Sequence, residues 1–293
     1  MDRLTANSLF DNQEELLKKM KDNFLACPPA VNHLKKLGVP EEEINKRIVK
    51  VNDFVEDIKF CKNCKGVNKC QKATPCLVTK MIYEDGILDR QVVPCKKYLE
   101  FIKFRNQFIV RDFPEEWLYS SLKDIDKSME RLELIKKYKS IIDNKTGEWI
   151  FITGEAGTGR SFVAANLCID MATRDLGPIA FIDVPTRFKE LGNKKEEAFS
   201  SLLEKYQKVP VLVLDDLGNE YKSDFVRETI FFQILNVRAK NNLFTIITSD
   251  FLMKDISDMY CLNQASKPKV EQIKRLLKRK CGEEINLGEI GAY

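Results

Sequence analysis

The sequence contains no apolar run long enough to cross a lipid bilayer. Its longest apolar stretches, such as residues 209–214, are far shorter than the roughly 20 residues that a membrane helix needs. The first residues carry no secretory signal pattern, and there is neither an internal repeat nor a low-complexity segment. These absences exclude a membrane-spanning protein, and we expect the chain to act in the reducing cytoplasm.

A strong net charge is also missing. The 293 residues include 48 Lys and Arg against 44 Asp and Glu, which gives a formal net charge of +4. A charge this small does not by itself indicate a nucleic-acid-binding protein. A hydrophobic content of 44% and a charged content of 31% are typical of a folded chain rather than a disordered one. The length fits one large domain or two ordinary ones.

Histidine is nearly absent, whereas cysteine is abundant. The single histidine, His33, is expected at the surface rather than as a metal ligand. Five of the nine cysteines fall within one short stretch: Cys61, Cys64, Cys70, Cys76 and Cys95. In a reducing compartment such a cluster indicates metal binding more often than disulfides, and a CxxC pair supplies two of the four ligands of tetrahedral Zn²⁺. Free buried thiols are the alternative, and a redox CxxC is disfavoured because no βαβ pattern surrounds it.

The N-terminal third of the chain has a helical pattern. Apolar residues recur at spacings of three and four over residues 9–24 and again over residues 44–58, and Pro28-Pro29 ends the first stripe. A further helix is predicted at about residues 95–109. We therefore predict a small helical, zinc-binding domain over residues 1–105.

Beyond residue 149 the pattern changes to short apolar runs that alternate with helices. Strands are predicted at residues 149–153, 179–184, 211–214 and 243–248, and helices from Phe162 to Ala172 and at about 186–206 and 224–240. This alternation predicts βαβ units, and so an α/β fold with a parallel sheet covered on both faces. We assign residues 106–130 to a linker and lead-in, and residues 131–293 to the α/β domain.

The first predicted strand of this domain ends in a phosphate-binding motif. The pattern GxxxxGK[ST] occurs with Arg160 in the place of the lysine. Glycines let successive N–H groups turn toward phosphate oxygens at a helix N-terminus, and Ser161 would offer a hydroxyl to Mg²⁺. An isolated glycine-rich turn is the alternative. We expect the nucleotide to contact Gly154, Glu155, Ala156, Gly157, Thr158, Gly159, Arg160, Ser161 and Phe162.

Acidic and polar residues close two later strands. Asp215 and Asp216 end an apolar strand in the form of a Walker B motif, the first acid placed to hold Mg²⁺ and the second to polarise the attacking water. Asp250, at the end of the next strand, is expected near the γ-phosphate or that water. The order of loop, acid-tipped strand and polar-tipped strand makes a nucleotide site the stronger interpretation.

Together these segments resemble the DnaC/DnaI-type AAA+ loaders of the bacterial replicative helicase, and the cysteine-bearing N-terminal domain is closest to the DnaI type. The resemblance rests on residues 181–191, on the Walker B block 209–218, on residues 226–251 and on the lead-in 113–126. It implies an ATPase that binds ATP or ADP with Mg²⁺, delivers the helicase hexamer onto single-stranded DNA, and self-associates through its AAA+ domain.

The resemblance also assigns roles to individual residues. Arg275 best matches the arginine that completes a neighbouring subunit's site, and Arg279 is a second candidate. A solvated basic helix face is the alternative for both, as it is for DNA contact by the other basic residues of this region. The family pattern favours Cys61, Cys64, Cys76 and Cys95 as the zinc ligands, with Cys70 as a competing ligand.

Three positions depart from the family pattern. Arg160 replaces a lysine, Asp250 stands where asparagine is usual, and residues 289–293 lack the usual basic residues. Because arginine and lysine differ in shape, we expect nucleotide binding with slow hydrolysis. Two other functions remain open: an IstB-like transposition ATPase, against which the cysteine domain argues, and a helicase-binding adaptor that needs no nucleotide.

Overall fold

The computed structural model describes residues 4–288, without the side chains of residues 4–12 and Ser257. The predicted absence of basic residues at 289–293 therefore lies outside the described residues. The chain divides into two compact units, Met1–Lys103 and Phe104–Tyr293, which we describe one at a time. No helix among the described residues is both long and apolar enough to span a membrane.

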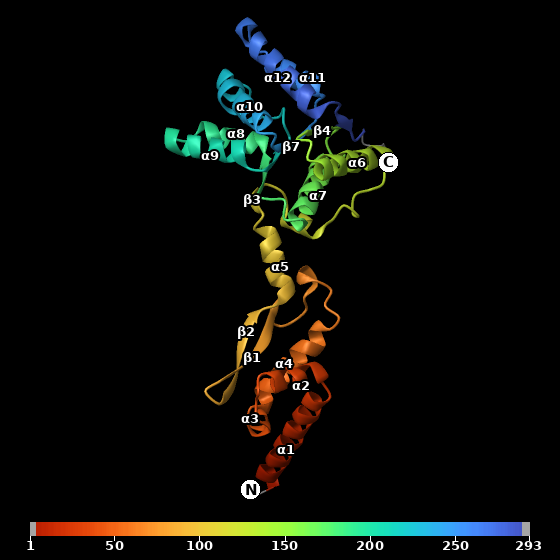
Figure 1. Cartoon of the computed structure of the whole chain (residues 1–293), viewed down its shortest axis with the longest axis vertical. Coiled ribbons are helices and arrows are strands. Elements are labelled where there is room, and N and C mark those ends of the chain that lie inside the picture. The colour runs from red at the N-terminus through yellow and green to blue at the C-terminus, as the bar shows by residue number, and fades with distance from the viewer. Residues whose placement is uncertain (1–3, 289–293) are drawn as a thin grey trace. The chain divides into compact units, whose positions relative to one another are not determined.

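Helices open the N-terminal unit (Figure 1). Four helices come first: α1 (Leu4–Leu25), α2 (Pro28–Lys36), α3 (Glu41–Lys46) and α4 (Ile48–Cys61). A short 3₁₀ turn, η1 (Val67–Lys69), follows them. Pro28 begins α2, because the first position of a helix needs no N–H donor. The helix α5 (Lys96–Arg105) runs across the boundary between the units.

A β-hairpin follows these helices, so the N-terminal domain that we predicted as helical is helical only in part. Strands β1 (Leu77–Glu84) and β2 (Ile87–Pro94) pair antiparallel along their whole length. The two-residue turn between them is Asp85-Gly86, with φ of 50° and 77°. Asp-Gly favours this kind of tight turn between strands, and it was the signal in the sequence that the helical prediction overlooked.

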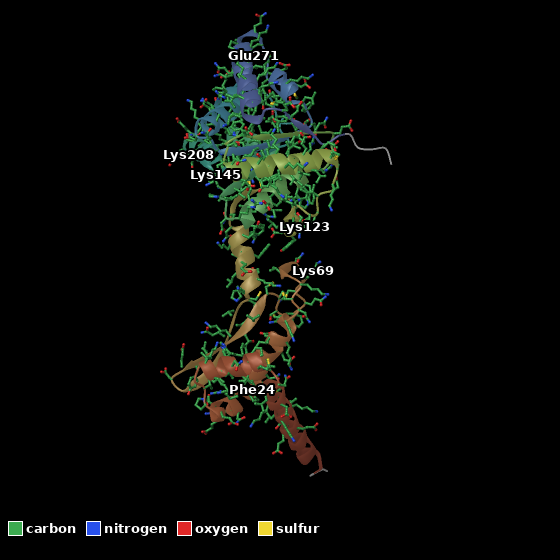
Figure 2. The ribbon with its side chains drawn as sticks, turned by 45° about the vertical axis from the view of Figure 1, so that its right-hand side comes forward. Phe24, Lys69, Lys123, Lys145, Lys208 and Glu271 are labelled. Atoms are coloured by element: carbon green, nitrogen blue, oxygen red, sulfur yellow. The ribbon has the colours of Figure 1, made fainter. Side chains whose placement is uncertain are left out.

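The hairpin is attached to the helices by apolar and polar contacts. Met81 and Leu88 are 1% and 0% exposed and pack into a core with helix residues that include Phe24, labelled in Figure 2. The Thr79 N–H donates to Asp57 Oδ2 at 2.6 Å. The Leu88 N–H donates to Glu43 Oε1 at 3.2 Å. Helix carboxylates therefore satisfy backbone donors that the hairpin leaves unpaired.

His33 is half-buried rather than on the open surface. Its ring packs against Phe54 with 5.2 Å between the ring centroids. It lies apart from the cysteine cluster in the sequence, as predicted, but packing rather than solvation describes its environment.

The C-terminal unit is built on a six-stranded parallel sheet, which confirms the predicted α/β class. Four strands match the predicted apolar runs: β4 (Ile150–Thr153), β5 (Ile179–Asp183), β6 (Val211–Asp215) and β7 (Phe244–Ser249). The sequence did not predict β3 (Phe108–Arg111) and β8 (Ile285–Asn286). The spatial order is β3-β5-β6-β7-β4-β8, and all neighbouring pairs are parallel. Strand β7 therefore lies between β4 and β6.

Helices cover both faces of the sheet. In Figure 1, α6 (Met129–Asn144) and α7 (Arg160–Thr173) lie on one side, and α8, α9 and α10 lie on the other. The predicted helix at 186–206 is two helices, and the predicted helix at 224–240 begins with a π-helical turn. The remaining elements are η2 (Glu115–Tyr119), α8 (Val184–Gly192), α9 (Glu196–Lys208), η3 (Val226–Phe231), α10 (Phe232–Lys240), α11 (Met253–Met259), η4 (Gln264–Ser266) and α12 (Lys267–Cys281).

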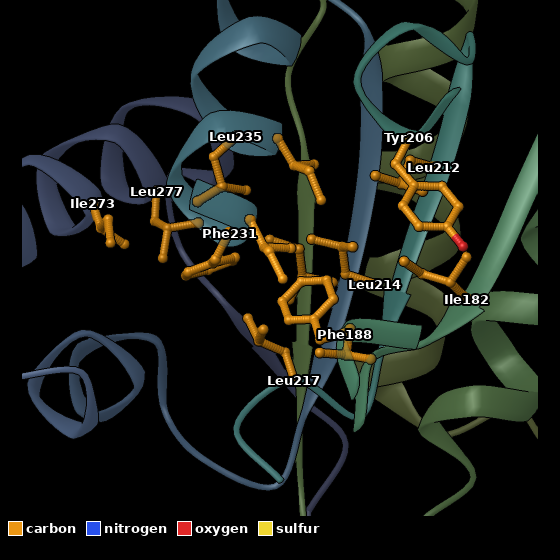
Figure 3. Packing of buried hydrophobic residues seen from close by; sticks show 14 of the residues in the cluster. Ile182, Phe188, Tyr206, Leu212, Leu214, Leu217, Phe231, Leu235, Ile273 and Leu277 are labelled. Atoms are coloured by element: carbon orange, nitrogen blue, oxygen red, sulfur yellow. The ribbon is translucent and has the colours of Figure 1, made fainter. Parts of the chain in front are cut away.

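The main core lies between the sheet and the helices α8 to α12. Figure 3 shows Leu214 of β6 beside Phe188 of α8 and Leu212 beside Tyr206 of α9, with Phe231 of η3 in the same cluster. The residues of β4, β5, β6 and β7 are almost all buried. Strands covered on both faces have continuous apolar sequences, and this burial fixes the polar ends of β4, β6 and β7 along one edge of the sheet.

Candidate nucleotide-binding site

The loop of residues 154–161 joins β4 to the first turn of α7. Gly154, Gly157 and Gly159 have φ of 150°, 88° and 83°. A Cβ built on Gly154 would lie 2.9 Å from Thr158 Oγ1 and 3.2 Å from the carbonyl oxygen of Gly288, so this position has no room for a side chain. The loop therefore has the curled backbone, at the N-terminus of a 14-residue helix, that suits a phosphate group.

The residues predicted to contact the nucleotide do not all lie at the same depth. Glu155, Ala156 and Gly157 are exposed at the tip of the loop. Thr158 is buried, and its hydroxyl donates to the Glu155 carbonyl at 2.8 Å. Phe162 faces the lead-in, where its ring meets that of Trp117 edge-on with 5.3 Å between centroids. Phe162 therefore connects the lead-in to the loop helix.

Arg160 is almost fully buried, at 9% exposure. Its Nη1 donates to the Gly154 carbonyl, and its Nη2 forms an ion pair with Asp250. The guanidinium thus lies against the loop backbone and the end of β7. A buried charge is stable only when it is paired and hydrogen-bonded, and both conditions are met here within the chain itself.

Asp215, the first Walker B acid, is buried at the end of β6. Burial raises its pKa to about 6, although hydrogen bonds from Thr248 and Ser161 act in the opposite direction, and the carboxylates of Asp216 and Asp183 raise it further. The Thr248 hydroxyl lies 2.5 Å from Asp215 Oδ1. The structure therefore brings Ser161 and Asp215, the two predicted Mg²⁺ ligands, into direct contact.

Asp216 has a left-handed backbone conformation, with φ of 59°, which aspartate tolerates better than most residues. Its N–H donates to Thr248 Oγ1 at 2.9 Å. Asn219 Nδ2 donates to Asp216 Oδ1 at 2.8 Å and to Asp250 Oδ2 at 3.1 Å. Asn219 thus connects the second Walker B acid to the end of β7. No motif in the sequence pointed to it.

A second residue that the sequence did not predict contacts the loop from α6. Arg131 Nη2 donates to the Thr158 carbonyl, and its Nε lies 3.1 Å from Asp126 Oδ2. Because Asp126 belongs to the lead-in, Arg131 links the lead-in to the phosphate-binding loop.

Arg275 and Arg279 lie elsewhere. Both are exposed on α12 and border a surface groove together with Phe232 and Asn236 of α10. The structure pairs Arg160 with Asp250 and Ser161 with Asp215, and Asn219 bridges Asp216 and Asp250. A role for Arg275 would therefore be toward another molecule.

The five clustered cysteines border one small cavity of about 20 Å³ in the N-terminal unit, which is room for roughly one water-sized group. The hairpin contributes to this arrangement, because the Cys95 N–H donates to the Cys76 carbonyl at 2.7 Å across its base. Within residues 4–288, however, no group of three or more His, Cys, Asp or Glu side chains is arranged to hold a metal ion. The predicted zinc site is thus not confirmed, although thiols are the donors that Zn²⁺ prefers.

Comparison with known proteins places the chain in a family. The model described as IstB-like ATP binding protein matches residues 72–265. The chain belongs to this family. This IstB-like chain is 22% identical over 278 residues to "Replicative helicase loader DnaI" of Bacillus subtilis (strain 168), a match that covers 91% of this chain and 89% of that one.

Two solved structures of this IstB-like chain's relatives extend the comparison. A crystal structure of DnaI matches with 28% identity and a TM-score of 0.56, over 62% of this chain and 97% of that one. A crystal structure of the DnaC helicase loader matches with 20% identity and a TM-score of 0.47, over 59% and 99%. The family match, the match to DnaI along most of the chain and the DnaI crystal structure confirm the predicted resemblance to DnaC/DnaI-type loaders.

Proposed function

We propose that this protein is a helicase loader that binds ATP and delivers the replicative DNA helicase onto single-stranded DNA. The observation that carries the proposal is the extent of the match to DnaI, which covers 91% of this chain. A match of that length includes most of the N-terminal unit, and we assign helicase binding to this unit. The cytoplasm, where a helicase hexamer and its DNA meet, is the proposed location.

The contacts at the sheet edge support a nucleotide-binding role. The N–H groups of residues 154–161 bind the phosphates, and the Ser161 hydroxyl with the Asp215 carboxylate offers hard oxygen ligands. Mg²⁺ bound there would neutralise phosphate charge. Asp216 polarises the attacking water, and Asn219, which donates to both Asp216 and Asp250, holds the Asp216 carboxylate in position.

Slow hydrolysis is part of the proposal. Arg160 donates to the Gly154 carbonyl and pairs with Asp250, so Asp250 already partly neutralises the charge that would otherwise interact with the phosphates. Nucleotide would then serve chiefly as a signal for conformation or assembly. The steady-state ATPase rate of Arg160→Lys should exceed that of the wild type severalfold; equal rates would contradict slow turnover caused by this arginine.

We further propose a structural zinc ion held by Cys61, Cys64, Cys76 and Cys95, with Cys70 as the competing ligand. The support is that these five thiols border one cavity and that the hairpin base places Cys76 next to Cys95. Metal analysis of the folded, purified protein should find one zinc per chain, and finding none would overturn the assignment.

Self-association and DNA contact are assigned to the C-terminal unit. Arg275 on the exposed face of α12 would complete a neighbouring subunit's site, with Arg279 as the second candidate. The same helix carries Lys274, Lys278 and Lys280, and clustered cations attract DNA phosphates in a salt-dependent way.

Co-purification with the replicative helicase, with and without ATP, tests the proposal. The wild type should retain the helicase, and Asp215→Asn should lose the nucleotide dependence while keeping its N-terminal unit. Retention of a transposase and double-stranded DNA instead of helicase would support the transposition ATPase that the family description leaves open. Retention of helicase with no measurable ATP binding would identify a nucleotide-independent adaptor.

A further inference from the structure

Two departures from the loader pattern meet in space. Arg160 begins α7, and Asp250 follows β7, yet the structure joins the two side chains in an ion pair. The arginine side chain is 10% exposed and the aspartate side chain is 31% exposed. The substitution in the loop and the substitution at the strand end are therefore one paired feature rather than two separate defects.

The chemistry of the two side chains explains why they belong together. A guanidinium presents several donors in a fixed fork, so Arg160 contacts the Gly154 carbonyl and the Asp250 carboxylate at once. A lysine offers a single point charge on a flexible stem. An asparagine at position 250 would leave the buried arginine without a counter-charge, which is costly in a site of low exposure.

The carboxylate of Asp250 also carries the type of charge that a nucleotide phosphate brings. This carboxylate lies against Arg160 of the phosphate-binding loop. The glycines of that loop have the backbone conformation that accepts an anion. We propose that Asp250 is an internal anion that holds Arg160 in the nucleotide-free protein and competes with the nucleotide's terminal phosphate for the guanidinium. This inference rests on the proposed nucleotide-binding function.

The competition would reach the second Walker B acid through one side chain. Asn219 donates to both Asp250 and Asp216. When a phosphate takes Arg160 from Asp250, the Asp250 carboxylate is left with Asn219 as its remaining partner at this edge, and the hydrogen bond from Asn219 to Asp216 must adjust. Asp250 is thus a positioning residue that links nucleotide binding to Asp216.

Calorimetric titration of the full-length chain with MgATP provides the first test. Asp250→Asn removes the competing anion, so we expect about tenfold tighter binding than in the wild type, which corresponds to about 1.4 kcal/mol. Because Asp250 is partly exposed, the gain should shrink as salt is raised. Asp143→Asn is the matched control, since Asp143 also pairs with an arginine, Arg174, but on an exposed surface; it should bind as the wild type does.

A double-mutant cycle with Arg160→Met and Asp250→Asn provides the second test, by denaturant unfolding with and without MgATP. Without nucleotide, the two changes should be non-additive by at least about fivefold in the unfolding equilibrium constant, as for residues in direct contact. Saturating MgATP should reduce this coupling toward zero. If Arg160→Met does not fold, Arg160→Gln, which also lacks the charge, replaces it in the cycle.

The outcomes separate the two levels of the proposal. Wild-type binding of MgATP with an Asp250→Asn affinity no tighter than wild type, or with no coupling in the nucleotide-free cycle, would overturn the competition and leave the nucleotide-binding function standing. Absence of MgATP binding in both the wild type and Asp250→Asn would overturn the nucleotide-binding function itself, and the competition with it.

Discussion

The N-terminal and C-terminal units bury their strands to very different degrees. Every residue of β4, β6 and β7 is buried, whereas β1 and β2 each bury a single residue, Met81 and Leu88. The hairpin instead donates hydrogen bonds from the Thr79 and Leu88 N–H groups to carboxylates of the helices. Buried apolar residues therefore hold the sheet of the C-terminal unit, whereas the hairpin of the N-terminal unit combines a few buried apolar side chains with polar contacts and, by our proposal, with its cysteines.

Removal of zinc is the change with the largest expected effect. Structural zinc contributes on the order of 10 kcal/mol of folding free energy in small domains, so Cys95→Ser or a chelator should abolish the cooperative unfolding of the N-terminal unit. The C-terminal transition should stay in place in differential scanning calorimetry. Cys261→Ser, at an exposed cysteine, is the control. An unchanged N-terminal transition would show that this unit does not need the metal.

Truncation of the C-terminal core comes next. Phe231 is fully buried and stacks on Tyr260 with 5.2 Å between ring centroids. Phe231→Ala should lower the free energy of unfolding of this unit by about 3–5 kcal/mol, because it loses buried area and leaves a cavity. Phe225→Ala, at a ring that is 45% exposed, is the control and should cost far less in urea denaturation. Equal losses would show that the core does not dominate.

A buried arginine offers a polar test within the same unit. Arg238 is 0% exposed and donates to the Thr245 hydroxyl at 2.9 Å and to the carbonyls of Tyr206, Val209, Pro210 and Phe244. Arg238→Met keeps the volume but leaves these acceptors unpaired, so it should cost about 2–4 kcal/mol. Arg279→Met, on the surface, should change urea stability little; a similar small loss at Arg238 would mean that the acceptors find other donors.

The smallest effect is expected at the hairpin turn. Gly86 has φ of 77°, and a Cβ placed there would meet nothing within 4 Å. Gly86→Ala should therefore cost about 1 kcal/mol, from backbone strain alone. Gly192→Ala is the control, since its Cβ is equally free and its φ is not positive. A larger loss at Gly86, seen as weaker N-terminal stability in urea, would show that the turn controls the whole unit.

The sequence predicted the buried strands better than the exposed ones. Strands β4 to β7 are buried on both faces, so their apolar runs predicted them almost residue by residue. The edge strands β3 and β8 have four and two residues, too few to give a pattern. The hairpin was missed because charged residues interrupt its alternation, although Asp85-Gly86 marked the turn.

The candidate site likewise has a part that the sequence could predict and a part that it could not. The phosphate-binding loop and the Walker B acids each lie in one continuous segment. Their residue types and spacing follow known motifs, so the sequence alone could predict them. The contact between Arg160 and Asp250, and the link from Asn219 to both Asp216 and Asp250, join distant segments. Pairing of this kind follows from strand order, which a single sequence does not specify.

The place of β7 between β4 and β6 has a consequence for how the unit could be observed. Its last two residues and the one that follows reach in different directions: Thr248 to Asp215, Ser249 to the Leu217 carbonyl and Asp250 to Arg160. Its amides are covered until one neighbour separates, so we expect them to exchange slowly with deuterium. A structural change at the phosphate-binding loop or at the Asp215 end of β6 would alter that exchange rate. Exchange at β7 can therefore report on both sides of the site.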